Sequence, residues 1–552
     1  MTTIKAENLP LSRIYHWERE LANETYLVQP MGGGVVRNFS WADAMGEARR
    51  VAAYLGSLDL PPGSSIGILS KNCAHWILSD FAIWMAGHVS VPIYPSLTAE
   101  SMRQILEHSE ARVLFVGKLD GWETTSMGVP QGVHCIGYPY PCTFNGLRWD
   151  DIVGCTQPLR ESIHRMPEDL ATIIYTSGTT GEPKGVMQTF GALGWCPEPA
   201  LQLMSIGPAD RMLSYLPLAH VAERAYGEML SVRTGLTLYF SESLDTFTAD
   251  LQRARPTVFL SVPRLWTKFQ HAVTSKLTPG PIEPVLKPMI LRQLGLDQVR
   301  FAASGAAALE PEIMQWYRDL GLELLEGYGM TEVCGLSHSC RPGQVRVGYV
   351  GTTTLGTECR FSEAGEILVR SPSSTIGYYK RPDLTAELFA EDGFIRTGDK
   401  GSMDDEGRLK VTGRVKEIFK TTKGKYVAPS RIENRLSVHP YVEACCVVGQ
   451  GFPQPCSLVS LSEEGRRLVR SGRREALTKS LIEHLEQVNR TLDDHEKVDF
   501  IVVVDATWNE ASGLVTPTFK IRRGPVEQRY GPCLSAWYGQ DLPVIWEAVA
   551  AW

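Results

Sequence analysis

The sequence predicts an α/β protein with a large N-terminal domain of parallel or mixed sheets covered by helices, and a smaller α+β C-terminal domain. Strand-like and helix-like patterns alternate through the first half, an order typical of parallel sheets with helices on both faces. At 552 residues the chain is too long for one hydrophobic core. After residue 413 the pattern changes to a long helix between two strand-like runs. We therefore expect domains at 1–413 and 414–552.

The first clearly marked helix begins after Ser40. Ser40 followed by Asp43 resembles a capping box, and Gly56 ends the helix. The apolar residues at helical spacing between them are Trp41, Ala44, Met45, Ala48, Val51, Ala52 and Leu55. Upstream, three glycines at 32–34 separate two strand-like runs, and they predict a hairpin turn rather than a nucleotide-binding loop.

Strand and helix signals alternate from there to the middle of the chain. Apolar runs predict strands at 65–70, 89–95 and 112–117, and helices at 75–87 and 99–111. A β-branched run at 171–176 predicts a further buried strand. In the C-terminal domain, strands are expected at 442–449 and 497–505, with a helix at 473–492.

Composition excludes several classes of protein. The net charge of −7 does not suggest a nucleic-acid-binding surface. The 12 cysteines contain no C-x-x-C pair, which indicates a reducing compartment and no zinc site. The N-terminal residues lack the apolar core of a signal peptide, and the longest apolar stretch is interrupted by Asp80. We expect a cytoplasmic protein with at most peripheral membrane association.

A loop at 175–186, YTSGTTGEPKGV, combines glycines, hydroxyl side chains and a lysine after an apolar run. Such a loop suits a polyphosphate, because its backbone N–H groups and hydroxyls approach an anion closely. The spacing excludes the P-loop: two residues separate Gly178 from Gly181, where the P-loop has four between its glycines, and Lys184 follows a proline. The alternative is a solvated turn with a chance lysine.

Four further stretches decide between these two interpretations. They are EGYGMTE at 326–332, RTGD at 396–399, GRVKEIFKTTKGKYVAP at 413–429 and TPTFKIRR at 516–523. Together with the loop, in this order and over nearly the whole chain, they resemble the adenylate-forming superfamily of acyl-CoA synthetases, luciferases and adenylation domains. The stretches YLPLAHVAER at 215–224 and TPTFKIRR are most similar to bacterial long-chain fatty-acid–CoA ligases.

The resemblance implies a two-step reaction that uses ATP, Mg²⁺ and CoA. A carboxylate attacks ATP to give acyl-AMP and pyrophosphate, and the acyl group then passes to a thiol. Charge develops on the phosphates during the first step, so donors and cations fixed in advance are needed. The residues implied to cradle the β- and γ-phosphates are Thr176, Ser177, Gly178, Thr179, Thr180 and Gly181. Lys184 would add positive charge.

The other motifs imply the rest of the site. Thr331 would bond the α-phosphate and Glu332 would bind Mg²⁺, which prefers oxygen ligands. The residues implied to surround the adenine are Gly305, Glu326, Gly327, Tyr328 and Gly329. Asp399 would accept both ribose hydroxyls, because a carboxylate offers two acceptor oxygens, with Arg414 in support.

Three residues are assigned to the substrate and to motion between the steps. Lys520 would bridge the substrate carboxylate and the α-phosphate during adenylation. His220 stands where the family places a residue at the mouth of the acyl site. Lys416 stands at the family's hinge, so the small domain is expected to be mobile and to carry Lys520 away before thiol attack.

Each assignment has a structural alternative. Asp399 is also typical of a turn, and Glu332 of an acid at a helix N-terminus. Lys520 fits a solvated basic cluster with Arg522 and Arg523. His220 is compatible with a core histidine, and Lys416 with a surface lysine.

The predicted function is activation of a hydrophobic, fatty-type acid followed by transfer to CoA. A carrier protein or an amine is the alternative acceptor. No long insertion separates Gly377 from Asp399, which disfavours the fatty acyl-AMP ligase branch. A non-catalytic nucleotide-binding module is a further alternative, and the presence of Lys184, Glu332 and Lys520 counts against it.

Overall fold

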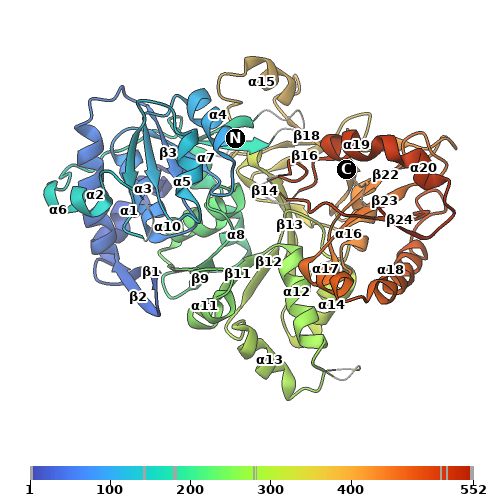
Figure 1. The fold of residues 1–552 in the computed structure, drawn as a ribbon. Coiled ribbons are helices and arrows are strands. Elements are labelled where there is room, and N and C mark those ends of the chain that lie inside the picture. The colour runs from blue at the N-terminus through green and yellow to red at the C-terminus, as the bar shows by residue number, and fades with distance from the viewer. Residues whose placement is uncertain are drawn as a thin grey trace. The chain divides into compact units, whose positions relative to one another are not determined.

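The computed structural model describes residues 4–140, 144–177, 183–277, 280, 282–509, 512–516 and 520–547 (Figure 1). Contacts divide the chain into two compact units. The first comprises Met1–Arg360, Leu368–Thr397 and Asp405–Arg408. The second comprises Phe361–Ile367, Gly398–Asp404 and Leu409–Trp552. The α/β class predicted from the alternating pattern is confirmed in the large unit.

A six-stranded sheet with the order β6-β5-β3-β4-β7-β8 forms the core of the first unit. Its strands are β3 (Ser65–Leu69), β4 (Val89–Ile93), β5 (Val113–Val116), β6 (His134–Gly137), β7 (Leu170–Ser177) and β8 (Pro183–Thr189). The strands from β6 to β7 are parallel, as predicted, and β8 returns antiparallel to β7. Successive residues of each strand therefore face opposite sides, and both sides are buried.

Helices cover both faces of this sheet. Ile68 and Phe115 face the apolar cluster that contains α2 (Trp41–Gly56) and α3 (Ala74–Met85), whereas Leu69 and Leu114 face the cluster that contains α4 (Ala99–Ser109). The Ser40 cap of α2 is confirmed, since Asp43 N–H donates to Ser40 Oγ at 3.1 Å. All seven apolar residues predicted for its inner face are buried.

Helix α3 is buried along its whole length, including Asp80. The Asp80 carboxylate is compensated by Arg224, whose Nη1 lies 2.6 Å away and which is itself fully buried. An isolated buried charge would be costly, so this pair explains how an acidic residue is tolerated in an apolar helix. Within the described ranges no helix is long and apolar enough to cross a membrane.

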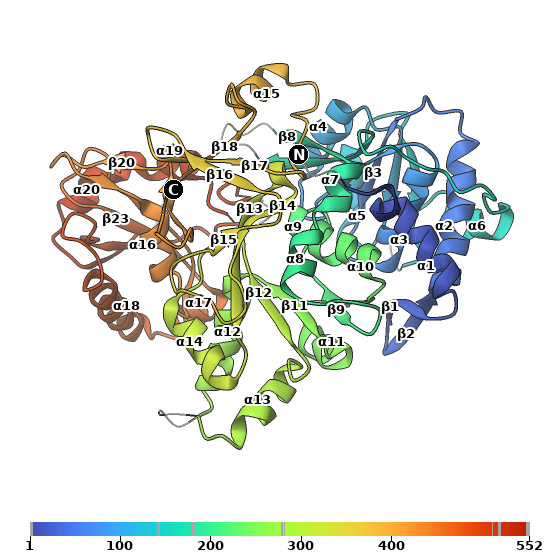
Figure 2. The same cartoon turned by 180° about the vertical axis from the view of Figure 1, so that it is seen from behind.

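A second sheet has the order β2-β1-β10-β9, with β1 (Thr25–Gly32), β2 (Val35–Ser40), β9 (Arg211–Ser214) and β10 (Thr237–Phe240). The three-glycine segment joins β1 to β2 as the predicted hairpin. Gly33 and Gly34 have φ values of 60° and 82°, a left-handed conformation that glycine adopts without steric cost. Helix α1 (Pro10–Glu20) packs beside α2 and α3 (Figure 2).

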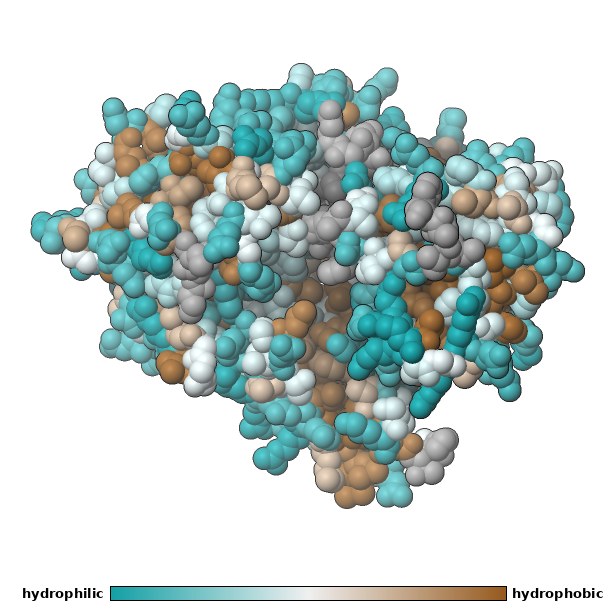
Figure 3. Space-filling model, in the orientation of Figure 1, coloured by the Kyte–Doolittle hydropathy of each residue, from teal (hydrophilic) through white to brown (hydrophobic). Residues whose placement is uncertain are grey.

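A third sheet has the order β11-β12-β13-β14-β15. Its strands are β11 (Val258–Ser261), β12 (Phe301–Ser304), β13 (Leu324–Met330), β14 (Gly335–Ser339) and β15 (Thr352–Thr353). The helices packed around it include α11 (Phe247–Ala254), α12 (Pro263–Thr274), α13 (Leu286–Leu294) and α14 (Pro311–Leu320). Val285 and Met289 are exposed at α13, and Figure 3 shows apolar side chains at this end of the molecule.

Shorter elements complete the first unit. They are η1 (Ala6–Asn8), α5 (Trp122–Thr125), η2 (Ser126–Gly128), α6 (Trp149–Cys155), α7 (Phe190–Trp195), α8 (Glu198–Leu203), α9 (Val221–Glu223), the π-helical η3 (Arg224–Met229), α10 (Leu230–Thr234), η4 (Thr331–Val333) and α15 (Pro382–Leu388). A four-stranded sheet has the order β16-β17-β18-β19, formed by β16 (Glu358–Phe361), β17 (Glu366–Arg370), β18 (Ile395–Met403) and β19 (Leu409–Arg414). The division into units assigns all of β19 and residues 398–403 of β18 to the second unit.

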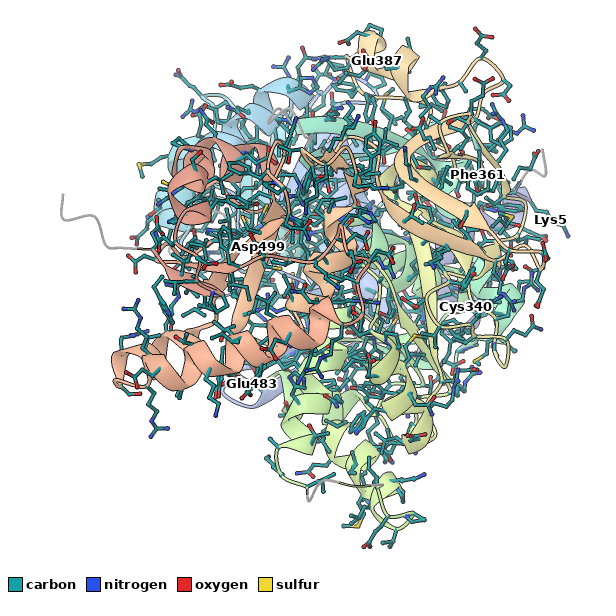
Figure 4. The ribbon with its side chains drawn as sticks, turned by 90° about the vertical axis from the view of Figure 1, so that its right-hand side faces the viewer. Lys5, Cys340, Phe361, Glu387, Glu483 and Asp499 are labelled. Atoms are coloured by element: carbon teal, nitrogen blue, oxygen red, sulfur yellow. The ribbon has the colours of Figure 1, made fainter. Side chains whose placement is uncertain are left out.

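The second unit contains a mixed sheet with the order β22-β23-β24-β25. Its strands are β22 (Val442–Val448), β23 (Cys456–Leu461), β24 (Ile501–Val504) and β25 (Val544–Trp546), and a small hairpin is formed by β20 (Phe419–Lys420) and β21 (Tyr426–Val427). The helices are α16 (Pro429–Leu436), α17 (Glu463–Arg470), α18 (Arg474–Asn489), α19 (Arg523–Tyr530), η5 (Gly531–Cys533) and α20 (Leu534–Tyr538). Figure 4 labels Glu483 on α18 and Asp499 just before β24.

Two predicted boundaries in this unit were wrong. The helix predicted to reach residue 492 ends at Asn489, where Thr491 Oγ1 donates to the carbonyl of Val488 at 2.6 Å. Such a local side-chain hydrogen bond competes with helical backbone bonding. The strand predicted at 497–505 is shortened to β24, because Val498 N–H donates to the side chain of Asn489 (2.8 Å) instead of a neighbouring strand.

Candidate functional site

The β7–β8 hairpin carries the two ends of the loop predicted to hold phosphates. Thr176 at the end of β7 pairs with Lys184 at the start of β8. Gly178, Thr179, Thr180 and Gly181 lie outside the described residues, and of Ser177 only the backbone is described. The role of the loop itself therefore stays a prediction.

The turn η4 carries Thr331 and Glu332 beside this hairpin, and both residues are buried. Gln188 Nε2 on β8 donates to the carbonyl of Thr331 at 2.7 Å, and Thr375 N–H donates to the carbonyl of Glu332 at 2.7 Å. Glu332 lies in the first turn of η4, as the alternative interpretation expects, but this 3₁₀ turn has only three residues and therefore few aligned peptide dipoles. The backbone of η4 is instead anchored by tertiary hydrogen bonds.

Tyr378 contacts both charged residues of this cluster, and sequence reasoning missed it. Its hydroxyl donates to Glu332 Oε1 at 2.7 Å, and the ammonium of Lys184 lies 5.4 Å from the centre of its ring. Burial, and then the negative charge of Glu332, raise the pKa of Tyr378, so the phenol keeps its proton. The Gly-Tyr-Tyr run at 377–379 shows no functional pattern by itself, and Glu332 is 46 residues away in the sequence.

Strand β13 carries the residues predicted to surround the adenine. Gly327, Tyr328 and Gly329 pair with β14, with Tyr328 opposite His338. A Cβ atom added at Gly329 would lie 1.6 Å from the carbonyl oxygen of Gly335, so the close approach of the two strands requires glycine there. Burial lowers the pKa of His338 to about 4, which keeps this imidazole neutral.

Glu326 ties β13 to the 304–309 segment, which contains Gly305. Its Oε1 accepts a hydrogen bond from Leu309 N–H at 2.8 Å, and burial raises the pKa of Glu326 to about 7. Ala306 has a φ of 71°, which is unfavourable for a residue with a Cβ and is common at ligand-binding segments. Gly305 and Gly327 are close neighbours, since a Cβ at Gly305 would lie 3.5 Å from the Gly327 carbonyl oxygen.

His220 caps the short helix α9. Its Nδ1 accepts a hydrogen bond from Ala222 N–H at 3.2 Å, and the side chain is only half-buried. The structure thus places His220 at a helix end rather than fully inside the apolar core.

Asp399 and Arg414 form an ion pair in the second unit. They lie opposite each other on β18 and β19, with Arg414 Nε 3.0 Å from Asp399 Oδ1. Asp399 lies within a strand and is buried, so its interpretation as a turn residue is wrong. The preceding residue, Gly398, donates its N–H to Glu366 Oε1 on β17 at 3.0 Å. This hydrogen bond fixes the backbone of β18 next to Asp399.

Lys416 and Lys520 occupy exposed positions in the same unit. Lys416 lies in the turn at 415–417 that follows β19, where Glu417 N–H donates to the carbonyl of Arg414 at 3.1 Å. Lys520 N–H donates to Thr516 Oγ1 at 3.1 Å, and Thr516 N–H donates to the carbonyl of Lys520 at 2.8 Å. This reciprocal pair fixes the backbone position of Lys520.

The alternative interpretation of Lys520, a solvated basic cluster with Arg522 and Arg523, does not hold for Arg523. The Arg523 side chain is 12% exposed, and its Nη2 donates to Glu433 Oε1 at 2.5 Å. Its Nη1 also donates to the carbonyl of Val447 at 2.6 Å, which links α19 to α16 and β22. Arg523 therefore stabilises the unit, and the alternative interpretation fails for this member of the cluster.

The donor set at Glu332 fits a magnesium ion that is shared with a polyphosphate. Among the described residues, no group of three or more His, Cys, Asp or Glu side chains could hold a metal by itself. Mg²⁺ in nucleotide sites typically binds one or two carboxylates and takes its other oxygen ligands from phosphates and water. Glu332, with the hydroxyl of Thr331 one residue before it, matches that chemistry.

Comparison with known proteins identifies relatives over nearly the whole length of the chain. The chain is 29% identical to the long-chain-fatty-acid–CoA ligase FadD15 of Mycobacterium bovis, covering 95% of this chain and 96% of that protein. It is 29% identical to the peroxisomal long chain acyl-CoA synthetase 6 of Arabidopsis thaliana, covering 92% and 82%.

Solved structures share the fold at lower identity. The adenylation domain of a carboxylate reductase from Mycobacterium chelonae superposes with a TM-score of 0.82 and 23% identity, covering 96% of this chain and 91% of that one. The anthranilate CoA ligase AuaEII, solved with anthranoyl-AMP, superposes with a TM-score of 0.77 and 22% identity, covering 97% of this chain and 100% of that one.

The family model for AMP-binding enzymes matches residues 16–379, and the model for their C-terminal domain matches residues 417–541. The chain belongs to the AMP-binding enzyme family.

Proposed function

We propose that the protein is an AMP-forming acyl-CoA synthetase for a hydrophobic, fatty-type carboxylic acid. In the first half-reaction an oxygen of the acid attacks the α-phosphorus of ATP, the bond to the β-phosphate oxygen breaks, and acyl-AMP and pyrophosphate form. In the second, the CoA thiol attacks the acyl carbon, loses its proton, and releases AMP.

One observation carries this proposal most directly. Glu332, Lys184 and Tyr378 converge beside the two ends of a Gly/Ser/Thr-rich loop. A buried carboxylate and a lysine that contact the same tyrosine, beside a sequence rich in hydroxyl side chains and glycine, suit a metal–polyphosphate ligand better than an uncharged one. The full-length relatives that are named as long-chain fatty-acid–CoA ligases supply the acid class and the acceptor.

The first half-reaction assigns a role to each residue of this cluster. Lys184 and the loop hold the departing pyrophosphate, Thr331 bonds the α-phosphate, and Glu332 holds Mg²⁺. When bound, Mg²⁺ neutralises charge on the phosphates. The β13 residues and Gly305 flank the adenine, and His220 lies at the mouth of the acyl site.

Three further residues are assigned to the ribose and the substrate carboxylate. Asp399 accepts from the ribose hydroxyls while Arg414 holds its carboxylate in place. Lys520 neutralises the substrate carboxylate during adenylation only. We place the domain boundary at 413/414 and the hinge at Lys416, so that a change at this turn separates the two half-reactions.

ATP–pyrophosphate exchange tests the first half-reaction. We expect exchange that requires Mg²⁺ and an added acid, and that strengthens across straight-chain acids as the chain lengthens. The nucleotide product, identified by mass spectrometry, should be AMP. Formation of ADP, or no exchange with any acid, would remove the proposal.

The acceptor is tested separately. Purified protein with acid, ATP and Mg²⁺ should form the thioester when CoA is added, and hydroxylamine or an acyl carrier protein in place of CoA should give much slower acyl transfer. If the carrier protein or the amine is preferred, the acceptor of the second half-reaction is not CoA. The proposed adenylation step is not affected by that result. Cell fractionation tests the cytoplasmic location, which we propose together with this activity.

A further inference from the structure

The segment at 375–379 is joined to β8 and η4 by backbone hydrogen bonds. Met187 N–H donates to the carbonyl of Gly377 at 3.0 Å, and Tyr379 N–H donates to the carbonyl of Gly185 at 2.8 Å. Tyr378 N–H donates to Thr385 Oγ1 at 2.9 Å. The backbone of Tyr378 is therefore held on both sides, and the residue is only 8% exposed.

The Glu332 backbone is equally well anchored, but its carboxylate is not fixed by those bonds. The peptide groups of η4 are bound by Gln188 and Thr375. The side-chain torsions of Glu332 are restrained instead by the Tyr378 hydroxyl, which donates to Oε1 at 2.7 Å. This hydrogen bond engages Oε1 and does not use Oε2.

We propose that Tyr378 is a positioning residue that orients the Glu332 carboxylate toward the magnesium ion of bound ATP. The proposal rests on the proposed function, because it assumes that Mg²⁺ and ATP bind beside Glu332. Groups that hydrogen-bond a metal ligand from behind set its orientation, and their loss typically weakens metal affinity about 10-fold to 100-fold. Tyr378 occupies that position for Glu332.

Tyr378→Phe isolates the hydroxyl, because phenylalanine keeps the ring that faces the Lys184 ammonium. Tyr379→Phe is the matched control: Tyr379 is the adjacent tyrosine, and its ring packs near His108, 5.9 Å between ring centres. A purely structural role for Tyr378 would weaken folding and lower ATP binding equally with and without Mg²⁺.

The readout is ATP affinity measured by calorimetry, with and without Mg²⁺, so that it does not depend on turnover. For Tyr378→Phe we expect the Mg²⁺-dependent part of ATP affinity to fall about tenfold, while affinity without Mg²⁺ is unchanged. Tyr379→Phe should match the wild type in both conditions. In a Glu332→Gln background, Tyr378→Phe should have no further effect, because coupled residues are non-additive.

Three results would overturn the inference. The first is a Mg²⁺ dependence of ATP affinity in Tyr378→Phe that equals that of the wild type. The others are an equal loss of ATP affinity with and without Mg²⁺, and effects of Tyr378→Phe and Glu332→Gln on ATP affinity that simply add. ATP affinity with Mg²⁺ is compared with ATP affinity without Mg²⁺ for the same variant. Partial unfolding is recognised because it lowers both values. If Mg²⁺–ATP binds normally but no acid supports pyrophosphate exchange, the proposed function is wrong. The role of Tyr378 in orienting Glu332 would not be contradicted by that result.

Discussion

Arg414 Nε lies 3.0 Å from Asp399 Oδ1 across the β18–β19 ladder. The arginine is half exposed, whereas only 10% of the Asp399 side chain is exposed. The pair therefore holds a mostly buried carboxylate in one orientation while one side of the guanidinium meets solvent. A carboxylate fixed in this way is suited to accept two neighbouring hydroxyls.

Asp399→Asn should weaken ATP binding about tenfold or more. The amide retains the size of the side chain but loses the charge, and hydrogen bonds to a charged acceptor contribute about 1.5–3 kcal/mol each. The measurement is the KM for ATP in pyrophosphate exchange. Asp405→Asn, on the exposed turn between the same strands, is the control. Equal KM values for Asp399→Asn and the wild type would exclude Asp399 from the nucleotide site.

Lys184→Ala should slow the adenylation step about 10²-fold, the scale for removing one preorganised charge contact from a transition state. The loss arises because the charge on departing pyrophosphate is no longer met. Single-turnover pyrophosphate release measures the rate, with Lys276→Ala, an exposed lysine after α12, as the control. An unaltered rate in Lys184→Ala would exclude this lysine from the phosphate site.

Lys520→Ala should separate the two half-reactions. Adenylation should fall about 10²-fold or more, because the substrate carboxylate and the α-phosphate repel each other without the ammonium. Conversion of supplied acyl-AMP to acyl-CoA should continue, since Lys520 serves only the first step. Lys423→Ala, an exposed lysine in the same unit, should affect neither.

Lys416→Pro should show the opposite pattern. Proline fixes φ near −65° and restricts the turn at 415–417, so acyl transfer should slow while adenylation continues. Lys416→Ala keeps the backbone free and is the control. If Lys520→Ala and Lys416→Pro each lose both half-reactions in equal proportion, a single fixed active site replaces the hinge.

Glu326→Gln should flatten the dependence of unfolding free energy on pH. Burial raises the pKa of Glu326 from its usual 4.5 to about 7, so between these values the folded state holds a proton that the unfolded chain has lost. Stability conferred by that proton is fully present below pH 4.5 and is lost as the pH rises through 7. At 1.36 kcal/mol per pKa unit, the total is on the order of 3 kcal/mol.

Urea unfolding at several pH values measures this difference. Glutamine still accepts from Leu309 N–H but does not titrate, so the variant should gain stability relative to the wild type as the pH rises from 4.5 to 7. Glu312→Gln, an exposed carboxylate on α14, should run parallel to the wild type. Parallel curves for Glu326→Gln would contradict the raised pKa.

Local sequence determined the elements whose signals lie within a few residues. Helix α2 begins and ends where its cap and Gly56 predict, and its seven apolar residues are buried, because helical periodicity selects the inner face directly. The glycine hairpin at 32–34 and the parallel strands also followed from local pattern. The motifs around Thr331, Asp399 and Lys520 indicated the family because residue identity alone carries a motif.

Only the tertiary structure decided which distant residues support those motifs. Tyr378 reaches Glu332 across 46 residues, Asn72 donates to Ser214 across 142, and Arg523 reaches Glu433 across 90. Such contacts depend on how sheets and loops pack, and no local spacing records them. The ends of α18 and β24 were mispredicted for a different reason: hydrogen bonds from the Thr491 side chain and to the Asn489 side chain, which span three and nine residues, replace the backbone pairing that the apolar pattern predicts.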